Sequence, residues 1–171
     1  MAAGNTYEAI ATQTLGSAAA SVTFSSIPGT YTDLVLVVSA RSLKAGTEDA
    51  FHIQVNGDSS ALYSRTEVYN STSGRATAET SYKYHGKVAG NTATSGVFAT
   101  SIINFQNYSN TTTFKTLIAR SGMADIATTE VKMSVGLYRS TNAISSMVLT
   151  TQSATNFAIG STFSLYGILA A

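Results

Sequence analysis

The sequence has no cysteine and no tryptophan, and only 11% of its 171 residues are charged. Without cysteine the chain can form neither a disulfide nor a thiolate metal site. Its 10 basic and 9 acidic residues leave a formal net charge of +1, which gives no strong field to attract nucleic acid or an anionic membrane. We therefore expect neither a nucleic-acid partner nor a membrane partner.

Long apolar runs are also missing, since no stretch approaches the roughly 20 residues that a membrane helix needs. The start, Met1-Ala2-Ala3-Gly4-Asn5, lacks the basic residues and the apolar block of a signal peptide. These absences predict a soluble intracellular product that does not use the secretion machinery. We expect residues 1–5 to form a flexible arm.

Serine and threonine supply more than a quarter of the chain, and hydrophobic residues supply 44% of it. Threonine is β-branched and serine favours turns, so this composition suits strands and turns better than helices. A chain of this length can bury a sizeable core. The composition predicts a single folded domain over residues 1–171.

Strand-like runs dominate the chain. Leu34-Val35-Leu36-Val37-Val38 is continuously apolar, as in a central strand covered on both sides. Val131, Met133, Val135 and Leu137 alternate with polar residues and share one face of a strand. The strand-like runs from which these strands are drawn lie near residues 7–15, 22–27, 31–40, 50–56, 61–69, 81–88, 97–105, 112–120, 131–139, 144–151 and 161–169. About 8–10 strands predict an all-β fold, an antiparallel β-sandwich of jelly-roll type.

Two turns are predicted in the first half of the chain. Ile27-Pro28-Gly29-Thr30 has the proline and glycine of a tight turn. Asn56-Gly57-Asp58 is a strong hairpin signal, because asparagine and glycine accept the positive φ angles of a two-residue turn. We expect residues 61–69 to be the return strand of that hairpin.

Residues 70–96 break the strand pattern and predict a long loop or an insertion, with a short strand near residues 81–88. Tyrosine is enriched at protein interfaces, and the aromatic and basic residues here are candidates for partner contact. These candidates are Arg75, Tyr82, Lys83, Tyr84, His85 and Lys87. An ordinary alternating strand with Tyr82 and Tyr84 packed inward is an equally weighted alternative.

The sequence offers little catalytic chemistry. His52 and His85 are its two histidines, too few for a zinc site without cysteine. Glu48-Asp49 is the one adjacent carboxylate pair, and its turn-like surroundings predict a solvated turn. We therefore expect no enzymatic activity, no catalytic residues, no cofactor and no metal.

Several short sequence segments, spread over nearly the whole chain outside residues 70–96, resemble segments of tailed-phage virion structural proteins. They lie at residues 27–36, 55–58 with 63–64, 107–115 with 120–122, 136–140 with 143–144, and 157–168. The resemblance implies a jelly-roll virion component, usually a trimer. Members of that group are capsid decoration (cement) proteins, and related domains occur in tails and fibres.

The sequence and this resemblance together lead to an expected function. The protein would be a trimeric decoration protein that binds the major capsid protein on the outside of the phage head, after synthesis in the host cytoplasm. The alternative is a tail-fibre or receptor-binding domain that recognises a host surface glycan. A third class, a small glycan-cleaving enzyme, would need two carboxylates about 5 to 10 Å apart in a cleft.

Overall fold

A computed structural model describes residues 6–70, 72–126 and 128–169. These residues form strands, turns and irregular segments, and none of them lies in a helix that could cross a membrane. The strands are β1 (Tyr7–Thr14), β2 (Ser21–Phe24), β3 (Asp33–Ala40), β4 (Glu48–Val55), β5 (Tyr63–Tyr69), β6 (Thr72–Glu79), β7 (Tyr82–Ala89), β8 (Ala99–Gln106), β9 (Lys115–Ala124), β10 (Thr129–Tyr138), β11 (Met147–Thr151) and β12 (Thr162–Ile168). The predicted arm at residues 1–5 lies outside the described residues.

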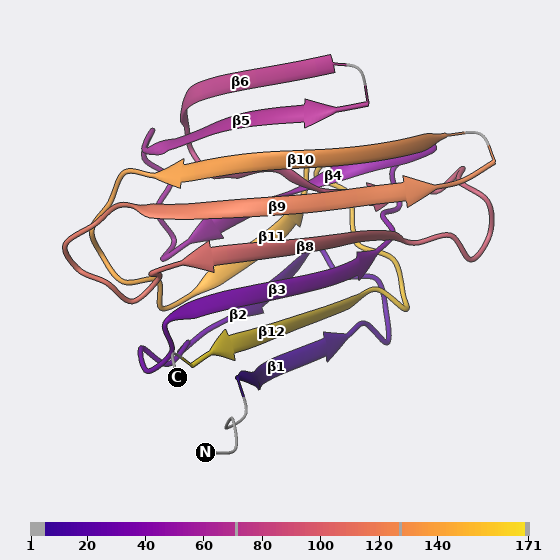
Figure 1. Ribbon diagram of the computed structural model, residues 1–171. Helices are drawn as coiled ribbons and strands as arrows, with labels where there is room; N and C mark the ends of the chain where they lie inside the picture. The colour runs from indigo at the N-terminus through magenta and orange to yellow at the C-terminus, as the bar shows by residue number, and fades with distance from the viewer. Residues whose placement is uncertain (1–5, 71, 127, 170–171) are drawn as a thin grey trace.

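The strands form two sheets of unequal size (Figure 1). The large sheet has eight strands in the order β1-β12-β3-β8-β9-β10-β5-β6, and the small sheet has four in the order β2-β11-β4-β7. Every pairing between these strands is antiparallel. The predicted all-β antiparallel sandwich is confirmed, with 12 strands among the described residues instead of 8–10.

The apolar core lies between the two sheets. The continuous apolar run at residues 34–38 forms the middle of β3, between β12 and β8, as predicted for a central strand. Leu36 from the large sheet and Ile53 and Leu149 from the small sheet are fully buried in one cluster. This part of the sandwich is closed, because each sheet covers the apolar face of the other.

The predicted hairpin at Asn56-Gly57 is wrong, although the turn itself is present. Both residues have positive φ, 53° for Asn56 and 65° for Gly57, but β4 and β5 lie in different sheets. The Asn56 side chain donates a hydrogen bond to the carbonyl of Ala143 at 2.8 Å and accepts one from the amide of Ser145 at 2.8 Å. These bonds hold the turn where the chain crosses from the small sheet to the large one.

The long loop predicted at residues 70–96 is also wrong, because β6 and β7 occupy most of that segment. β6 pairs with β5 at the edge of the large sheet, and exposed positions occur along its whole length. A strand covered on neither face needs no apolar residues, which explains its loop-like composition. The short strand expected near residues 81–88 is confirmed as β7.

The large sheet extends beyond the small one. β7, the edge of the small sheet, packs across β8, β9 and β10 and touches the start of β5, while the rest of β5 and β6 continue past it (Figure 1). We call β10, β5 and β6 the overhang. The inner face of the overhang carries charged residues, and its outer face carries apolar ones.

Candidate functional site

A charged cleft opens where the overhang passes the edge of the small sheet. Its volume is about 390 Å³. It is lined by Glu48, Arg65, Glu67, Tyr69, Lys87, Glu130, Lys132 and Gln152. The floor comes from β5 and β10 of the large sheet, and the opposite wall comes from β4, β7 and the residue after β11. We refer to these eight residues as the charged cleft.

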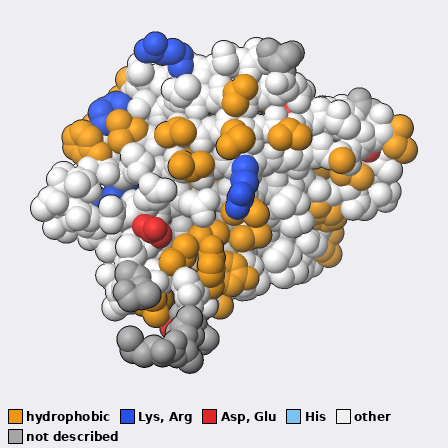
Figure 2. Space-filling view, viewed as in Figure 1, with side chains coloured by type: hydrophobic (Ala, Val, Ile, Leu, Met, Phe, Trp, Pro, Cys, Tyr) orange, Lys and Arg blue, Asp and Glu red, His pale blue; other side chains and the backbone are white. Residues whose placement is uncertain are grey.

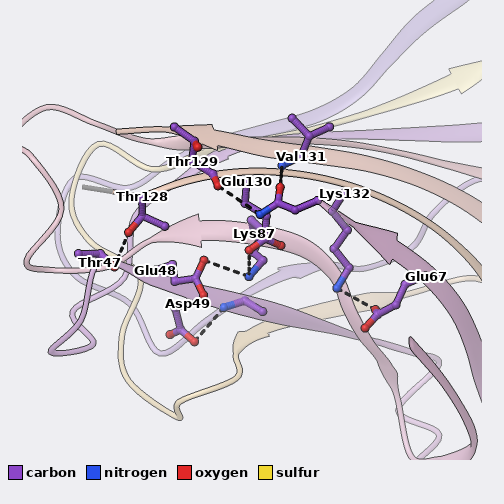
Figure 3. Close-up of polar contacts among 12 residues, drawn as sticks. Thr47, Glu48, Asp49, Glu67, Lys87, Thr128, Thr129, Glu130, Val131 and Lys132 are labelled. Atoms are coloured by element: carbon purple, nitrogen blue, oxygen red, sulfur yellow. Dashed lines mark hydrogen bonds and ion pairs between the residues drawn. The ribbon is translucent and has the colours of Figure 1, made fainter. Parts of the chain in front are cut away.

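Lys87 joins two carboxylates at one end of the cleft (Figure 3). Its Nζ lies 2.7 Å from Oε2 of Glu130 and 3.3 Å from Oε2 of Glu48. Burial raises the pKa of Glu130 above its ordinary value, despite the nearby ammonium. Burial is the largest effect on Glu48 and acts in the same direction. The charge and hydrogen bond of Lys87, a hydrogen bond with Glu130 and the charge of Lys44 together outweigh it and lower the pKa of that carboxyl. Of the two carboxyls, Glu130 is therefore the one that takes up a proton more readily.

Lys132 anchors the other end. Its Nζ lies 2.7 Å from Oε2 of Glu67, and the same oxygen lies 3.2 Å from Nε of Arg65 (Figure 3 shows the lysine pair). Arg65 also forms an ion pair with Glu79. The Lys132 ammonium lies over the Tyr69 ring, 5.5 Å from its centroid, and burial lowers the pKa of this lysine. Each cation of the cleft thus has a carboxylate partner.

The alternation of β5 and β10 explains why charges face inward here. Glu130 and Lys132 are two apart on β10, and Arg65 and Glu67 are two apart on β5, so each pair points to one face. The small-sheet strand that meets this stretch is its edge strand β7, and β7 faces Glu130 with the ammonium of Lys87 rather than with an apolar side chain. Buried charges must be paired to offset their lost hydration, and these are. The second carboxylate oxygen of Glu130, Oε1, is an acceptor that is buried without a hydrogen-bond partner.

Glu48 and Glu130 form the carboxylate pair in this cleft that comes nearest to the arrangement of a glycosidase. In such an enzyme the scissile bond lies between the acid and the base or nucleophile. Here both carboxylates bind the same ammonium, so Lys87 occupies the position between them. The pair therefore gives no support for glycan cleavage, and the absence of enzymatic activity stays a prediction.

The outer face of the overhang is a second candidate site. On β10 the exposed fractions are 71% for Val131, 54% for Met133 and 52% for Val135. Val68 of β5 lies opposite Met133 in the strand register, and Ile118 of β9 lies opposite Val135. These five side chains form the outer apolar face, and Figure 2 shows hydrophobic side chains gathered over this part of the sheet. The alternation predicted for residues 131–137 is present, with its apolar side toward solvent.

The structure places two of the predicted contact residues in the core. Tyr82 is fully buried, and its ring packs edge-on against Tyr63 at a centroid distance of 5.0 Å. His85 is buried too, with Nδ1 2.8 Å from Oγ of Ser134. Their side chains cannot form a contact surface, so this part of the prediction is wrong. The alternative, a strand with Tyr82 packed inward, is confirmed.

The other predicted contact residues separate from one another. Arg75 is exposed on β6, Lys83 is half-buried on β7, and Lys87 points into the charged cleft. The side chain of Tyr84 lies outside the described part of the structure. Partner contact through Arg75 and Lys83 stays a prediction.

The adjacent carboxylates Glu48 and Asp49 do not lie in a solvated turn, as the sequence suggested, but begin β4. Asp49 is buried and accepts a hydrogen bond from Oγ of Ser153 at 2.5 Å. Glu48 faces the charged cleft. Across residues 6–70, 72–126 and 128–169, no group of three or more histidines, cysteines and carboxylates is arranged to hold a metal ion.

Sequence reasoning missed both the charged cleft and the inverted strand that forms it. Lys132 and Ser134 alternate with apolar residues, which ordinarily indicates a polar outer face. The available signal was the repetition of charge on both strands, Arg65 with Glu67 and Glu130 with Lys132. Opposite charges repeated at a spacing of two favour pairing across a shared sheet face.

Comparison with known proteins leaves the family open. No family model matches the chain, and no curated protein matches it. Among solved structures, a marine PL-14 alginate lyase from Aplysia kurodai is similar at a TM-score of 0.35 and 9% identity, over 85% of this chain and 72% of the lyase. The Caenorhabditis elegans galectin LEC-6 gives a TM-score of 0.27 and 7% identity, over 90% of this chain and 94% of the galectin. At these scores neither likeness supports an argument about function.

Proposed function

We propose that the protein is a decoration protein of a tailed-phage capsid, which binds the outside of the head shell as a trimer and stabilises it. The outer apolar face is the surface that docks on the major capsid protein. Each copy bridges neighbouring shell subunits, so that a local rupture of the shell must also break the bridging contacts. The phage setting and the trimer come from the sequence resemblance alone.

The observation that supports docking is the inversion of β10. Val131, Met133 and Val135 face solvent, while Lys132 and Ser134 on the same strand are buried. This arrangement does not stabilise an isolated protein, because the apolar side chains stay in water while the charged side chains lose their hydration. A contiguous exposed apolar patch is typical of a surface that another protein covers.

The composition of the outer apolar face suits such a contact. The charged residues beside it are Arg120, in register with Met133, and Arg75 of β6, which lines the same hollow as Val135. Few charges therefore need to lose their hydration when the face is covered, and desolvation of unpaired charges is the main polar cost of association. A standard stable interface buries roughly 1,600 Å² in total, and several such contacts per trimer add avidity.

The test compares filled heads with and without the protein. Heads that carry the protein should release DNA at a higher temperature than undecorated heads. The double variant Val131→Lys/Met133→Lys should fold but lose head binding, because two ammonium groups would be buried at the contact. Ser21→Lys, a substitution at an exposed position of the small sheet, is the matched control and should bind like the wild type.

Two results would contradict this proposal. One is equal DNA-release temperatures with and without the protein. The other is undiminished head binding by the Val131→Lys/Met133→Lys variant, which would remove the outer apolar face from the contact. The oligomeric state, measured by light scattering, tests the trimer separately.

The second candidate is a tail-fibre or receptor-binding domain that recognises a host surface glycan. The charged cleft favours it, because a concave site with converging polar groups is what a soluble ligand requires. Glycan binding by the isolated protein together with no binding to heads would place this candidate first.

A further inference from the structure

We propose that the charged cleft is a binding site for a neutral saccharide of one or two sugar units. The inference rests on the cleft alone and holds whether or not the protein decorates a capsid. It would supply the binding site that the second candidate function needs. Nothing on the outer apolar face takes part in it.

The charge balance of the cleft selects a neutral ligand. Its lining holds three carboxylates, of Glu48, Glu67 and Glu130, and three cations, of Arg65, Lys87 and Lys132. All three cations lie within ion-pair distance of a carboxylate. A charged ligand would have to separate one of these pairs, which leaves a buried charge unpaired at a high cost. A neutral ligand can bind without separating them.

The donors and acceptors alternate, which is the pattern that a row of hydroxyl groups satisfies. A hydroxyl donates one hydrogen bond and accepts others, so it can bridge a carboxylate and a neighbouring ammonium. Hydrogen bonds to charged partners are the stronger kind. Oε1 of Glu130 is a built acceptor for such a group, because it is buried without a partner on a side chain that is 8% exposed.

The shape and depth of the cleft fit the same class of ligand. A volume of about 390 Å³ lies at the lower end of the range for small-molecule sites, roughly 300 to 1,000 Å³. Glu48, with a side chain 39% exposed, and Gln152 lie toward solvent, while Glu67 and Glu130 form a buried floor. Tyr69 adds a half-buried aromatic ring beside them. A sugar ring presents hydroxyls at its rim and C–H groups on its faces, which match these two kinds of surface.

The experiment is a titration of the full chain, labelled with ¹⁵N, with maltose, cellobiose, lactose and galactose, followed by amide chemical shifts. Glucuronate and glucosamine are charged comparisons of the same size as galactose. At least one neutral sugar should shift the amides of Glu48, Lys87, Glu130 and Gln152 in a saturable way, and the charged sugars should bind at least tenfold more weakly.

Three variants locate the site. Glu130→Gln on the floor and Glu48→Gln at the mouth should each weaken binding of the same sugar at least fivefold. Glu48 is partly exposed, so its variant tests the site even if Glu130→Gln fails to fold. Glu8→Gln on β1, at the opposite edge of the large sheet, is the control and should bind like the wild type.

The inference is overturned if none of the four neutral sugars shifts cleft amides, or if the shifts fall outside the cleft. Equal binding by both cleft variants and the wild type, or tighter binding of a charged sugar, would overturn it as well. None of these results affects the DNA-release measurement on heads, so the two proposals can fail independently.

Discussion

The closed half of the sandwich and the overhang use the same strand geometry in opposite ways. In the closed half, β3 turns Leu34, Leu36 and Val38 toward the small sheet and buries them completely. In the overhang, β10 turns Lys132 and Ser134 inward and its valines outward. Alternation along a strand thus fixes which residues share a face, whereas the neighbouring layer decides which face is buried.

The largest expected effect contrasts a core residue with an outer one. Leu36→Ala should lower the free energy of unfolding by about 3 kcal/mol, because it leaves a cavity in the closed half. Val135→Ala, on the outer apolar face, should change it by less than about 0.5 kcal/mol in the isolated protein. Urea unfolding of both variants measures the contrast, and similar losses would show that the two halves do not differ in this way.

A substitution at Gly86 tests the packing of β7 against β4, where the closed half meets the overhang. A Cβ at this position of β7 would lie 1.9 Å from Cε1 of Phe51 on β4, so the buried ring would have to move. Gly86→Ala should therefore cost about 2 kcal/mol of stability through overpacking. Gly16→Ala, where a Cβ meets nothing within 4 Å, is the control. Equal denaturation midpoints for the two variants would contradict the packing between β4 and β7.

Lys132→Met breaks the charge pairing of the overhang. Glu67 would keep Arg65 but lose its closer partner, so we expect a loss of about 1 to 2 kcal/mol. The double variant Lys132→Met/Glu67→Met should lose less than the single one, because no unpaired charge remains. A double variant that is less stable than Lys132→Met would show that the ion pair stabilises the fold beyond the cost of its desolvation.

The last expected effect is a dependence of stability on pH. Burial, with help from the charges of Lys132 and Arg65, lowers the pKa of His85 from 6.5 to about 3. The unfolded chain takes up this proton near pH 6.5 and the folded protein only near pH 3, so the stability from neutral His85 is complete above 6.5 and is lost as the pH falls toward 3. The slope contributed is at most about 1.4 kcal/mol per pH unit.

His85→Gln should remove most of that slope between pH 6 and 4, while the overall stability at pH 7 changes by the loss of packing alone. Burial lowers the pKa of His52 as well, but this side chain is less enclosed, so His52→Gln should flatten the profile less. Denaturation at several pH values compares the variants. An unchanged slope in His85→Gln would mean that His85 is charged in the folded protein.

How far the fold was predictable depends on the range of the interactions. β3, β8 and β12 were predicted because their apolar side chains face the core, so that the local hydrophobic pattern agrees with the burial. β6 was missed because an edge strand exposed on both faces has the composition of a loop. The hairpin after β4 was misassigned because the Asn56-Gly57 turn fixes a local reversal of the chain and cannot specify which strand follows in the sheet.

The candidate sites were less predictable than the fold. Tyr82 and His85 were expected at a surface, and the register of β7 against β4 put them in the core. In the sequence Glu130 and Lys132 look like ordinary exposed polar positions. In the folded protein they point inward, where Glu130 binds Lys87 and Lys132 binds Glu67. The partners of each charge lie on other strands, so no short stretch of sequence contains the site.

The antiparallel β-sandwich could be inferred from the amino-acid sequence alone, because strand alternation and turn residues are local properties. The sequence also excluded disulfides and thiolate metal sites, since cysteine is absent. The unequal size of the sheets, eight strands against four, depends on long-range strand pairing and is visible in the three-dimensional structure alone. That inequality puts β10 under the edge strand β7, whose Lys87 and His85 meet its inward side chains, while the valines of β10 lie on the outside.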